Sequence, residues 1–344
     1  MKDLYLFDVS GLVYAGDYLQ PRKSKEISER LSGLPVGGVK HAISKILGNN
    51  KEENHLVAVF DSHTDKKIDH PEYKGQRTFR PDIFVQQEML KQILPALGVA
   101  TVCVDGYEAD DLFYSIVEDE LQNNKYGFVY LCTDDSDISG AIRAPRIARM
   151  GITAKMPFIT QSNYSTLVKS GKVIQYNTVL AYHMFCGKPS NNIHALPGGG
   201  AKLYRDYCEF CTSNNIKPDL QSTELAMKCW VKDAFERKVI DIDTVKTIVS
   251  RIPIIYPNIL KEVPDYHTAK VDAKRASEYL SIIYEPQAAA MLNVPMIDLN
   301  VLGRTRLDSW VSLFRSGAVA ADNGVPADTS FFMENKPEGS VGGF

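Results

Sequence analysis

The sequence predicts an α/β fold with a mainly parallel central sheet that is flanked by helices. Two observations point to this class. Four short apolar runs, at residues 4–7, 56–60, 100–104 and 128–132, read as buried strands and alternate with helical patterns. Each run is followed by acidic residues. Strands that alternate with helices are typical of sheets in which the strands lie parallel.

Helical patterns fill the segments between the predicted strands. One apolar stripe spans residues 39–47, and a second spans 83–97 and closes at Gly98. A third includes residues 112–117 and has Asp110 in its first turn. The order strand, helix, strand, helix therefore continues through the first half of the chain.

The second half reads as helices interrupted by prolines. Helical patterns cover residues 224–238, 242–252 and 272–284. His-x-x-Cys at 183–186 and Cys-x-x-Cys at 208–211 have a zinc-like spacing, but both pairs lie in helical runs. We interpret them as packing residues and expect no chemistry from the last third of the chain.

The composition is that of an ordinary globular protein. The chain has 344 residues, with 42 acidic and 39 basic side chains and a formal net charge of −3, so the overall charge does not indicate a nucleic-acid partner. Asp3 and Asp8 interrupt the apolar N-terminus, which excludes a signal peptide, and no run approaches the ~20 apolar residues of a membrane span. Six cysteines without framework spacing favour a reducing compartment. We expect a cytoplasmic protein that does not bind membranes.

Acidic residues follow all four predicted strands. Parallel strands end at the same edge of a sheet, so we expect these carboxylates to share one cleft. Divalent cations such as Mg²⁺ prefer carboxylate oxygens, and two such ions promote phosphodiester hydrolysis. The alternative is that each acid is only a turn residue or a helix cap. The seven candidate ligands are Asp8, Asp61, Glu108, Asp110, Asp111, Asp135 and Asp137.

A long polar loop separates the second predicted strand from the next helix, at about residues 62–82. The loop is basic and carries two aromatic rings, which are the ingredients of a surface that binds single-stranded nucleic acid. A solvated loop with incidental lysines is the alternative. The residues concerned are Lys66, Lys67, Tyr73, Lys74, Arg77, Phe79 and Arg80.

Six motifs in order along the chain resemble the flap endonuclease / 5′-nuclease family of phages and bacteria, which is related to the 5′ domain of bacterial DNA polymerase I. The resemblance covers roughly residues 1–215, and GYEADD is its most specific block. The motifs are LFDVSGLVY (6–14), VAVFDS (57–62), PEYKGQR (71–77), GYEADD (106–111), TDDSD (133–137) and NNIHALPGGGAK (191–202).

This resemblance implies an organisation in three parts. Residues 1–185 would form a PIN-like nuclease core with a helical arch at about 62–82. Residues 186–320 would form a helical DNA-binding region with a helix–turn–helix segment and a Gly-rich turn at 192–202. Residues 321–344 would be a flexible tail.

The resemblance also implies roles for single residues. Asp8, Asp61, Glu108, Asp110 and Asp111 would hold or orient a first metal ion, and Asp135 and Asp137 would approach a second. Mg²⁺ would be the cofactor, Mn²⁺ would substitute for it, and K⁺ is possible at the Gly-rich turn. Lys74 and Arg77 would act on the scissile phosphate as catalytic residues. The DNA-binding residues would be Tyr73, Arg80, Gly198, Gly200 and Lys202.

One block departs from the family pattern. Where the family usually has Gly-Asp-Ser-Ser-Asp-Asn-Ile, this chain reads GKPSNNI at 187–193, which places Lys188 and Asn191 at the positions of two aspartates. The second metal site therefore loses two carboxylates. We expect a second ion to bind weakly there, or only together with DNA phosphates.

The expected function is a structure-specific 5′ nuclease that cleaves flaps or 5′ ends of DNA near a junction between single and double strand. Primer removal in replication is the expected context, with RNA–DNA hybrids as further substrates and a single-strand-binding protein or clamp as partner. Two alternatives stay open: a PIN-like ribonuclease, and a weakly active or non-catalytic replication protein that binds junctions.

Overall fold

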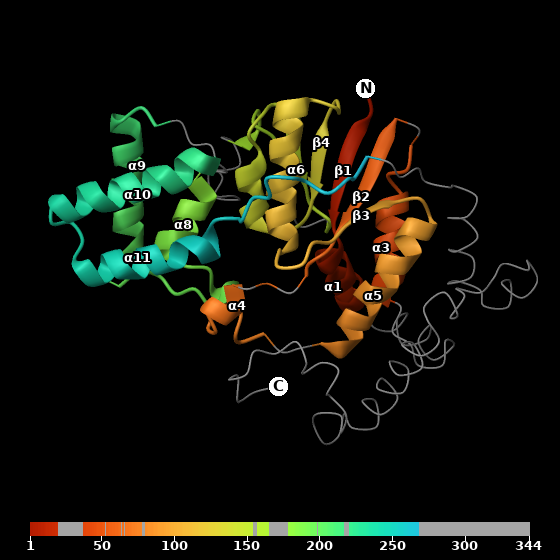
Figure 1. Ribbon diagram of the computed structural model, residues 1–344, viewed down its shortest axis with the longest axis horizontal. Coiled ribbons are helices and arrows are strands. Elements are labelled where there is room, and N and C mark those ends of the chain that lie inside the picture. The colour runs from red at the N-terminus through yellow and green to blue at the C-terminus, as the bar shows by residue number, and fades with distance from the viewer. Residues whose placement is uncertain are drawn as a thin grey trace, which may run out of the picture.

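A computed structural model describes most of the first 267 residues (Figure 1). The described ranges are 1–19, 37–51, 53–62, 64, 66–77, 80–153, 157–164, 178–197, 199–216 and 220–267. The predicted helix at 272–284, the predicted tail at 321–344, Phe79 and Gly198 lie outside these residues. The predicted division into domains stays a prediction.

A five-stranded parallel sheet forms the centre of the molecule. Its order is β3-β2-β1-β4-β5, and each neighbouring pair is parallel. The four predicted strands are confirmed, and the fifth was not predicted. The strands are β1 (Asp3–Asp8), β2 (Asn54–Val59), β3 (Ala100–Val102), β4 (Val129–Cys132) and β5 (Ile147–Met150). This arrangement confirms the predicted fold class, a mainly parallel sheet flanked by helices.

Helices cover both faces of the sheet because the strands are apolar on both faces. Helices α1 (Val9–Leu19), α3 (Gly37–Leu47) and α5 (Pro81–Ala96) pack on one face, where their buried residues form one apolar cluster with alternate strand residues. Helix α6 (Ala109–Asn123) packs on the other face in a second cluster. Helices α3, α5 and α6 agree with the predicted patterns, whereas α1 was not predicted.

A group of helices lies beside the sheet and shares the core of its α6 face (Figure 1). Two of these helices, α10 and α11, confirm predicted helical patterns. The group contains α8 (Val179–Cys186), α9 (Gly200–Ser213), α10 (Leu220–Glu236) and α11 (Ile242–Ile255). Between the sheet and this group lie the short helix α4 (Lys66–Asp69) and two 3₁₀ helices, η1 (Ser136–Ala141) and η3 (Pro189–Asn191). Because α4 belongs to the predicted arch, the arch is helical at its start.

The start of α9 approaches the end of α8 so closely that only glycine fits. A Cβ atom at Gly200 would lie 2.1 Å from the carbonyl oxygen of Phe185. Gly199, the residue before the helix, has a φ of 122°, which also favours glycine. The resemblance places Gly200 among the DNA-binding residues, which stays a prediction. The structure shows that helix packing also requires a glycine at this position.

The segment after α11, residues 256–267, crosses the surface of α6 and reaches the start of β2 (Figure 1). We call this segment the strap. The amide of Leu260 donates to Ser115 Oγ of α6 at 2.9 Å, and the Tyr266 hydroxyl donates to Asp119 Oδ2 at 2.7 Å. His55 Nε2 lies 2.5 Å from the carbonyl oxygen of Tyr266. The strap thus ties the helical group to the sheet.

Among the helices of the described residues, none is both long enough and apolar enough to cross a membrane.

Candidate metal centre

The carboxyl ends of β1, β2 and β4 meet at one edge of the sheet, next to the start of α6. The Thr133 hydroxyl, just beyond β4, donates to Asp8 Oδ2 at 2.9 Å. The amide of Ala109 donates to Asp61 Oδ1 at 2.8 Å, which joins the end of β2 to α6. The chain order reverses between β1 and β4, and ligands of open α/β sheets bind at such a switch point.

Ionisation of Asp8 is energetically unfavourable in the folded protein. Burial raises the pKa of Asp8 to about 6, and the charges of Asp61 and Asp135 contribute in the same direction. Two hydrogen bonds, from the Gly11 amide and the Thr133 hydroxyl, oppose this rise without cancelling it. A bound cation would relieve the repulsion and return the carboxylate to its charged form.

Two lysines neutralise the acids at the start of α6. Lys74 Nζ lies 2.6 Å from Glu108 Oε1, and Lys66 Nζ lies 3.3 Å from Glu108 Oε2. The buried Tyr73 hydroxyl donates to the same carboxylate at 2.9 Å. Burial alone would raise the pKa of Glu108, but Lys74 and Lys66 outweigh it and lower that pKa to about 2.

Asp111 links the cleft to the helix terminus and to the strap. It is fully buried, accepts from the Glu108 amide at 3.0 Å and completes the capping box of α6. Lys66 Nζ lies 2.9 Å from Asp111 Oδ1, and the Asn258 amide of the strap donates to the same oxygen at 2.7 Å. Asp111 is thus occupied by hydrogen bonds within the protein, and it fixes the positions of Glu108, Lys66 and the strap.

A third lysine neutralises the acids that follow β4. Lys188 Nζ lies 2.8 Å from Asp135 Oδ1 and 2.6 Å from Asp137 Oδ2. His183 Nε2 lies 3.2 Å from Asp137 Oδ1. Burial opposes ionisation of Asp137, yet His183 and Lys188 outweigh it and hold the pKa of Asp137 below its usual range.

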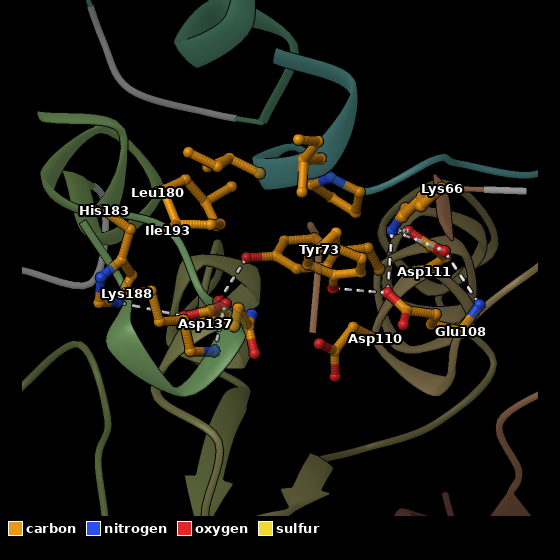
Figure 2. Close-up of a pocket in the computed structure, with 15 residues that line it drawn as sticks. Lys66, Tyr73, Glu108, Asp110, Asp111, Asp137, Leu180, His183, Lys188 and Ile193 are labelled. Atoms are coloured by element: carbon orange, nitrogen blue, oxygen red, sulfur yellow. Dashed lines mark hydrogen bonds and ion pairs between the residues drawn. The ribbon is translucent and has the colours of Figure 1, made fainter. Parts of the chain in front are cut away.

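Asp110 lies between the two lysine-neutralised groups. In Figure 2, Lys188 and His183 lie beside Asp137 on one side of a cavity, and Lys66 lies beside Asp111 on the other. Burial raises the pKa of Asp110 well above its usual value, and the charge of Asp135 adds to this rise. Oxygen atoms of Asp110, Asp135 and Asp137 lie within 4.8 Å of one another.

All seven predicted carboxylates therefore gather at one edge of the sheet. Four of them have lysine partners. Among the described residues, Asp8, Asp61 and Asp110 have no ion pair with a lysine or arginine. Carboxylate oxygens that have no direct ion pair among the described residues fit a hard divalent cation.

The base of the arch is fastened to the loop at 188–193. The Lys74 amide donates to the Asn191 carbonyl at 3.0 Å, and Arg77 Nη2 donates to Asn191 Oδ1 at 2.8 Å. Gln76 Nε2 donates to the Pro189 carbonyl at 2.8 Å. Both predicted catalytic residues, Lys74 and Arg77, thus lie at the cleft, and Asn191 serves as an anchor for the arch.

The predicted DNA-binding residues are more scattered. Tyr73 is only 4% exposed and its ring belongs to the core, so in this conformation it is not available to stack on a base. Burial also raises the pKa of its hydroxyl above the usual value. Arg80 forms an ion pair with Asp17 of α1 at 2.7 Å. Lys202 is exposed in the first turn of α9, where Gly200 is buried.

Sequence reasoning missed several residues that shape the centre. Thr133 bridges two strand ends, and the Tyr114 hydroxyl of α6 donates to the Asp137 carbonyl at 2.7 Å. Arg149, buried within β5, donates through Nη1 to Ser139 Oγ at 2.7 Å and so supports η1. The sequence signal for Arg149 is its place within a short apolar run, where a charged side chain indicates a buried group with hydrogen-bond partners.

Comparisons with known proteins show which sequences and structures this chain is similar to. Residues 3–166 match the family described as 5′-3′ exonuclease, N-terminal resolvase-like domain. A 5′-3′ exonuclease of Aquifex aeolicus is 26% identical over 248 residues, which cover 69% of this chain and 76% of that protein. DNA polymerase I of Mycobacterium tuberculosis is 28% identical over 206 residues, which cover 58% of this chain. The matched region is only 22% of that polymerase.

Two solved structures match most of this chain at low sequence identity and with TM-scores below 0.5. The 5′-exonuclease of phage T5 with bound zinc ions is 15% identical with a TM-score of 0.46, covering 91% of this chain and 98% of that one. The catalytic core of Rad2 in complex with DNA substrate is 15% identical with a TM-score of 0.45, covering 83% and 86%. By the match of residues 3–166 and by its sequence relatives, the chain is similar to proteins of the 5′-3′ exonuclease family.

Proposed function

We propose that this protein is a structure-specific 5′ nuclease that hydrolyses DNA phosphodiesters near junctions between single and double strand. The observation that carries the proposal is the convergence of seven carboxylates at one sheet edge, three of them without a basic partner among the described residues. The similarity to a 5′-3′ exonuclease supports the same reading.

Mg²⁺, or Mn²⁺ in its place, would be held by the carboxylates around Asp8, Asp61 and Asp110. When bound, the ion supplies an activated water and neutralises charge on the phosphate. The oxygen of water would form a bond to phosphorus as the bond from phosphorus to the 3′ oxygen breaks, which leaves a 5′-phosphate on the product. Asp8 and Asp110 are suited to cation binding because burial makes their charged forms unfavourable without one.

The basic residues at the arch base would position the phosphate. Lys74 now pairs with Glu108, and Arg77 with Asn191, so each has an acceptor that an incoming phosphate oxygen can replace. Pre-placed cations of this kind stabilise negative charge that develops during phosphoryl transfer. The single-stranded 5′ end would pass the arch, and Lys202 at the start of α9 would contact the duplex.

The cellular setting follows from the same activity. A 5′ nuclease of this kind fits removal of RNA primers during replication in the cytoplasm, with RNA–DNA hybrids as further substrates. A single-strand-binding protein or a clamp would be a natural partner, and K⁺ would fit the Gly-rich turn of the DNA-binding region.

A second candidate function is a junction-binding replication protein with little or no catalytic activity. One observation favours it: the ion pairs of Lys188 with Asp135 and Asp137 occupy two of the carboxylates that a second metal ion would need. A ribonuclease with a similar acidic cleft is a third reading. The long arch and the segment at 191–202 favour DNA junctions over that alternative.

One experiment separates the three candidates. The full chain is incubated with a 5′-flap DNA, the same flap made of RNA, and a blunt duplex, each with Mg²⁺ and with EDTA. We expect Mg²⁺-dependent cleavage of the DNA flap near the junction, slower cleavage of the RNA flap and little cleavage of the duplex. Binding to each substrate is measured in parallel by fluorescence anisotropy in EDTA.

The other outcomes each exclude the proposal. Junction binding without Mg²⁺-dependent cleavage of any substrate would favour the non-catalytic replication protein. Cleavage of the RNA flap with an intact DNA flap would favour the ribonuclease.

A further inference from the structure

Lys188 makes the contacts that a bridging metal ion would make. Its Nζ atom lies 2.8 and 3.1 Å from the two carboxylate oxygens of Asp135, and 2.6 Å from Asp137 Oδ2. Only 8% of the residue is exposed, so the ammonium group is enclosed by the two carboxylates and their surroundings. A solvated surface lysine has no such fixed position.

The backbone holds Lys188 in this place. The Lys188 amide donates to the Ile193 carbonyl at 2.8 Å, and the Ile193 amide donates back to the Lys188 carbonyl at 3.1 Å. Gly187, just before it, has a φ of 81°, and a Cβ there would lie 2.5 Å from the Ile193 carbonyl oxygen. A pinned loop and an obligatory glycine therefore direct the side chain into the cleft.

The neighbouring position does not restore the missing ligand. Asn191 is neutral and buried, and its Oδ1 atom accepts from Arg77. His183 Nε2 already lies 3.2 Å from the second oxygen of Asp137. Both oxygens of Asp137 thus have nitrogen partners, and a second divalent ion would have to displace Lys188 while facing its positive charge.

We propose that the Lys188 ammonium takes the place of a second divalent ion, so that the centre holds one divalent ion, near Asp8, Asp61 and Asp110. The chemical role of Lys188 in this inference rests on the proposed nuclease function. Its test counts bound metal ions and does not depend on cleavage. The ammonium supplies positive charge near the phosphate, while its N–H groups donate to the two carboxylates. An ammonium group cannot coordinate a water molecule and lower its pKa, as a metal ion does. Only the single divalent ion would therefore activate the water.

The test counts bound Mn²⁺ by equilibrium dialysis of the full chain, with free Mn²⁺ measured by electron paramagnetic resonance. We expect one tight Mn²⁺ per wild-type chain and two per chain in Lys188→Asp. Lys232→Asp is the matched control, because it adds the same carboxylate at an exposed lysine of α10, to which no role is assigned. The control should keep one tight Mn²⁺.

Lys188→Met serves as a second variant in case Lys188→Asp does not fold, which circular dichroism will show. Methionine removes the ammonium without adding a ligand. A second Mn²⁺ should therefore bind, with an affinity at least about tenfold lower than that of the first. Two tight ions in the wild type, or one ion in every folded Lys188 variant, would overturn the inference. One ion in a wild type that cleaves none of the substrates above would leave the inference intact and overturn the nuclease function.

Discussion

Carboxylates of identical chemistry behave differently in this cleft because their neighbours differ. Glu108 faces two lysines and a tyrosine hydroxyl, and its pKa falls to about 2. Asp8 faces other carboxylates and has no lysine partner among the described residues, so burial raises its pKa to about 6. The ionised form of Asp8 therefore destabilises the folded protein. Asp8 lies in the part of the cleft to which we assign the divalent ion.

The variant Asp8→Asn tests this destabilisation. In EDTA at pH 8 it should raise the free energy of unfolding by up to about 3 kcal/mol, since the folded state no longer holds an ionised carboxylate with a raised pKa. The gain should shrink as the pH falls from about 6 to 4, because protonation relieves the same penalty in the wild type. Urea unfolding of the wild type and of Asp8→Asn, at pH 8 and at about pH 4, measures the difference in free energy of unfolding between the two proteins.

Glu108→Gln is the matched comparison for that experiment. It should be less stable than the wild type at neutral pH, because Lys66 and Lys74 lose their shared charged partner. If Asp8→Asn were instead the less stable of the two in EDTA at pH 8, the account of Asp8 would be wrong.

The residues of the cleft were predictable by type, whereas their pairing was not. An acid after every strand is a local signal, and the structure brings all seven acids together. The contacts of Lys66 with Asp111 and of Lys188 with Asp135 join positions 45 and 53 residues apart. Which lysines turn inward depends on the path of the arch and of the loop at 188–193, and local sequence does not specify either path.

At the scale of elements, helix α6 is the central support of the site. Glu108 is its N-cap, and its first turn carries Asp110 and Asp111. The strap contacts the helix at three residues along its length, Asp111, Ser115 and Asp119. Side chains four residues apart lie on one face of a helix, so the strap follows a single face of α6. The strap thereby holds the helix terminus that presents the carboxylates.

Removing one hydroxyl tests the strap. Tyr266 donates to Asp119 Oδ2 at 2.7 Å and lies 3.0 Å from Oε1 of the fully buried Glu120. Tyr266→Phe should lower the free energy of unfolding by about 1–3 kcal/mol, because the buried Glu120 carboxylate and the partly exposed Asp119 carboxylate lose a donor. Tyr14→Phe, at a half-exposed ring of α1, should change it by less than about 0.5 kcal/mol. Equal effects in the two variants by urea unfolding would show that the strap does not stabilise α6.

Two elements, β5 and α1, were missed from the sequence, each for its own physical reason. Strand β5 has only four residues and contains Arg149, so it lacks an uninterrupted apolar run. Helix α1 follows β1 without any loop, and its apolar residues read as a continuation of the N-terminal strand pattern. Strands β1 to β4 were recoverable because each has an apolar run flanked by polar residues.

At the scale of the whole molecule, the net charge of −3 averages the acidic cleft with the rest of the chain. Setting the seven cleft acids aside leaves 35 acidic residues against 39 basic ones. Binding of a divalent ion would reduce the negative charge of the cleft further. A slightly acidic overall charge therefore does not argue against a nucleic-acid partner when seven of the acids gather in one cleft.

The central claim is that the carboxylate cleft cuts DNA. The most direct measurement compares the wild type, Asp110→Asn and the exposed-residue control Asp243→Asn on one 5′-flap DNA, with cleavage followed in Mg²⁺ and binding followed in EDTA. We predict Mg²⁺-dependent cleavage by the wild type and the control, and a loss of more than about 100-fold in Asp110→Asn with binding unchanged. Unchanged turnover in Asp110→Asn would contradict the assignment of the site.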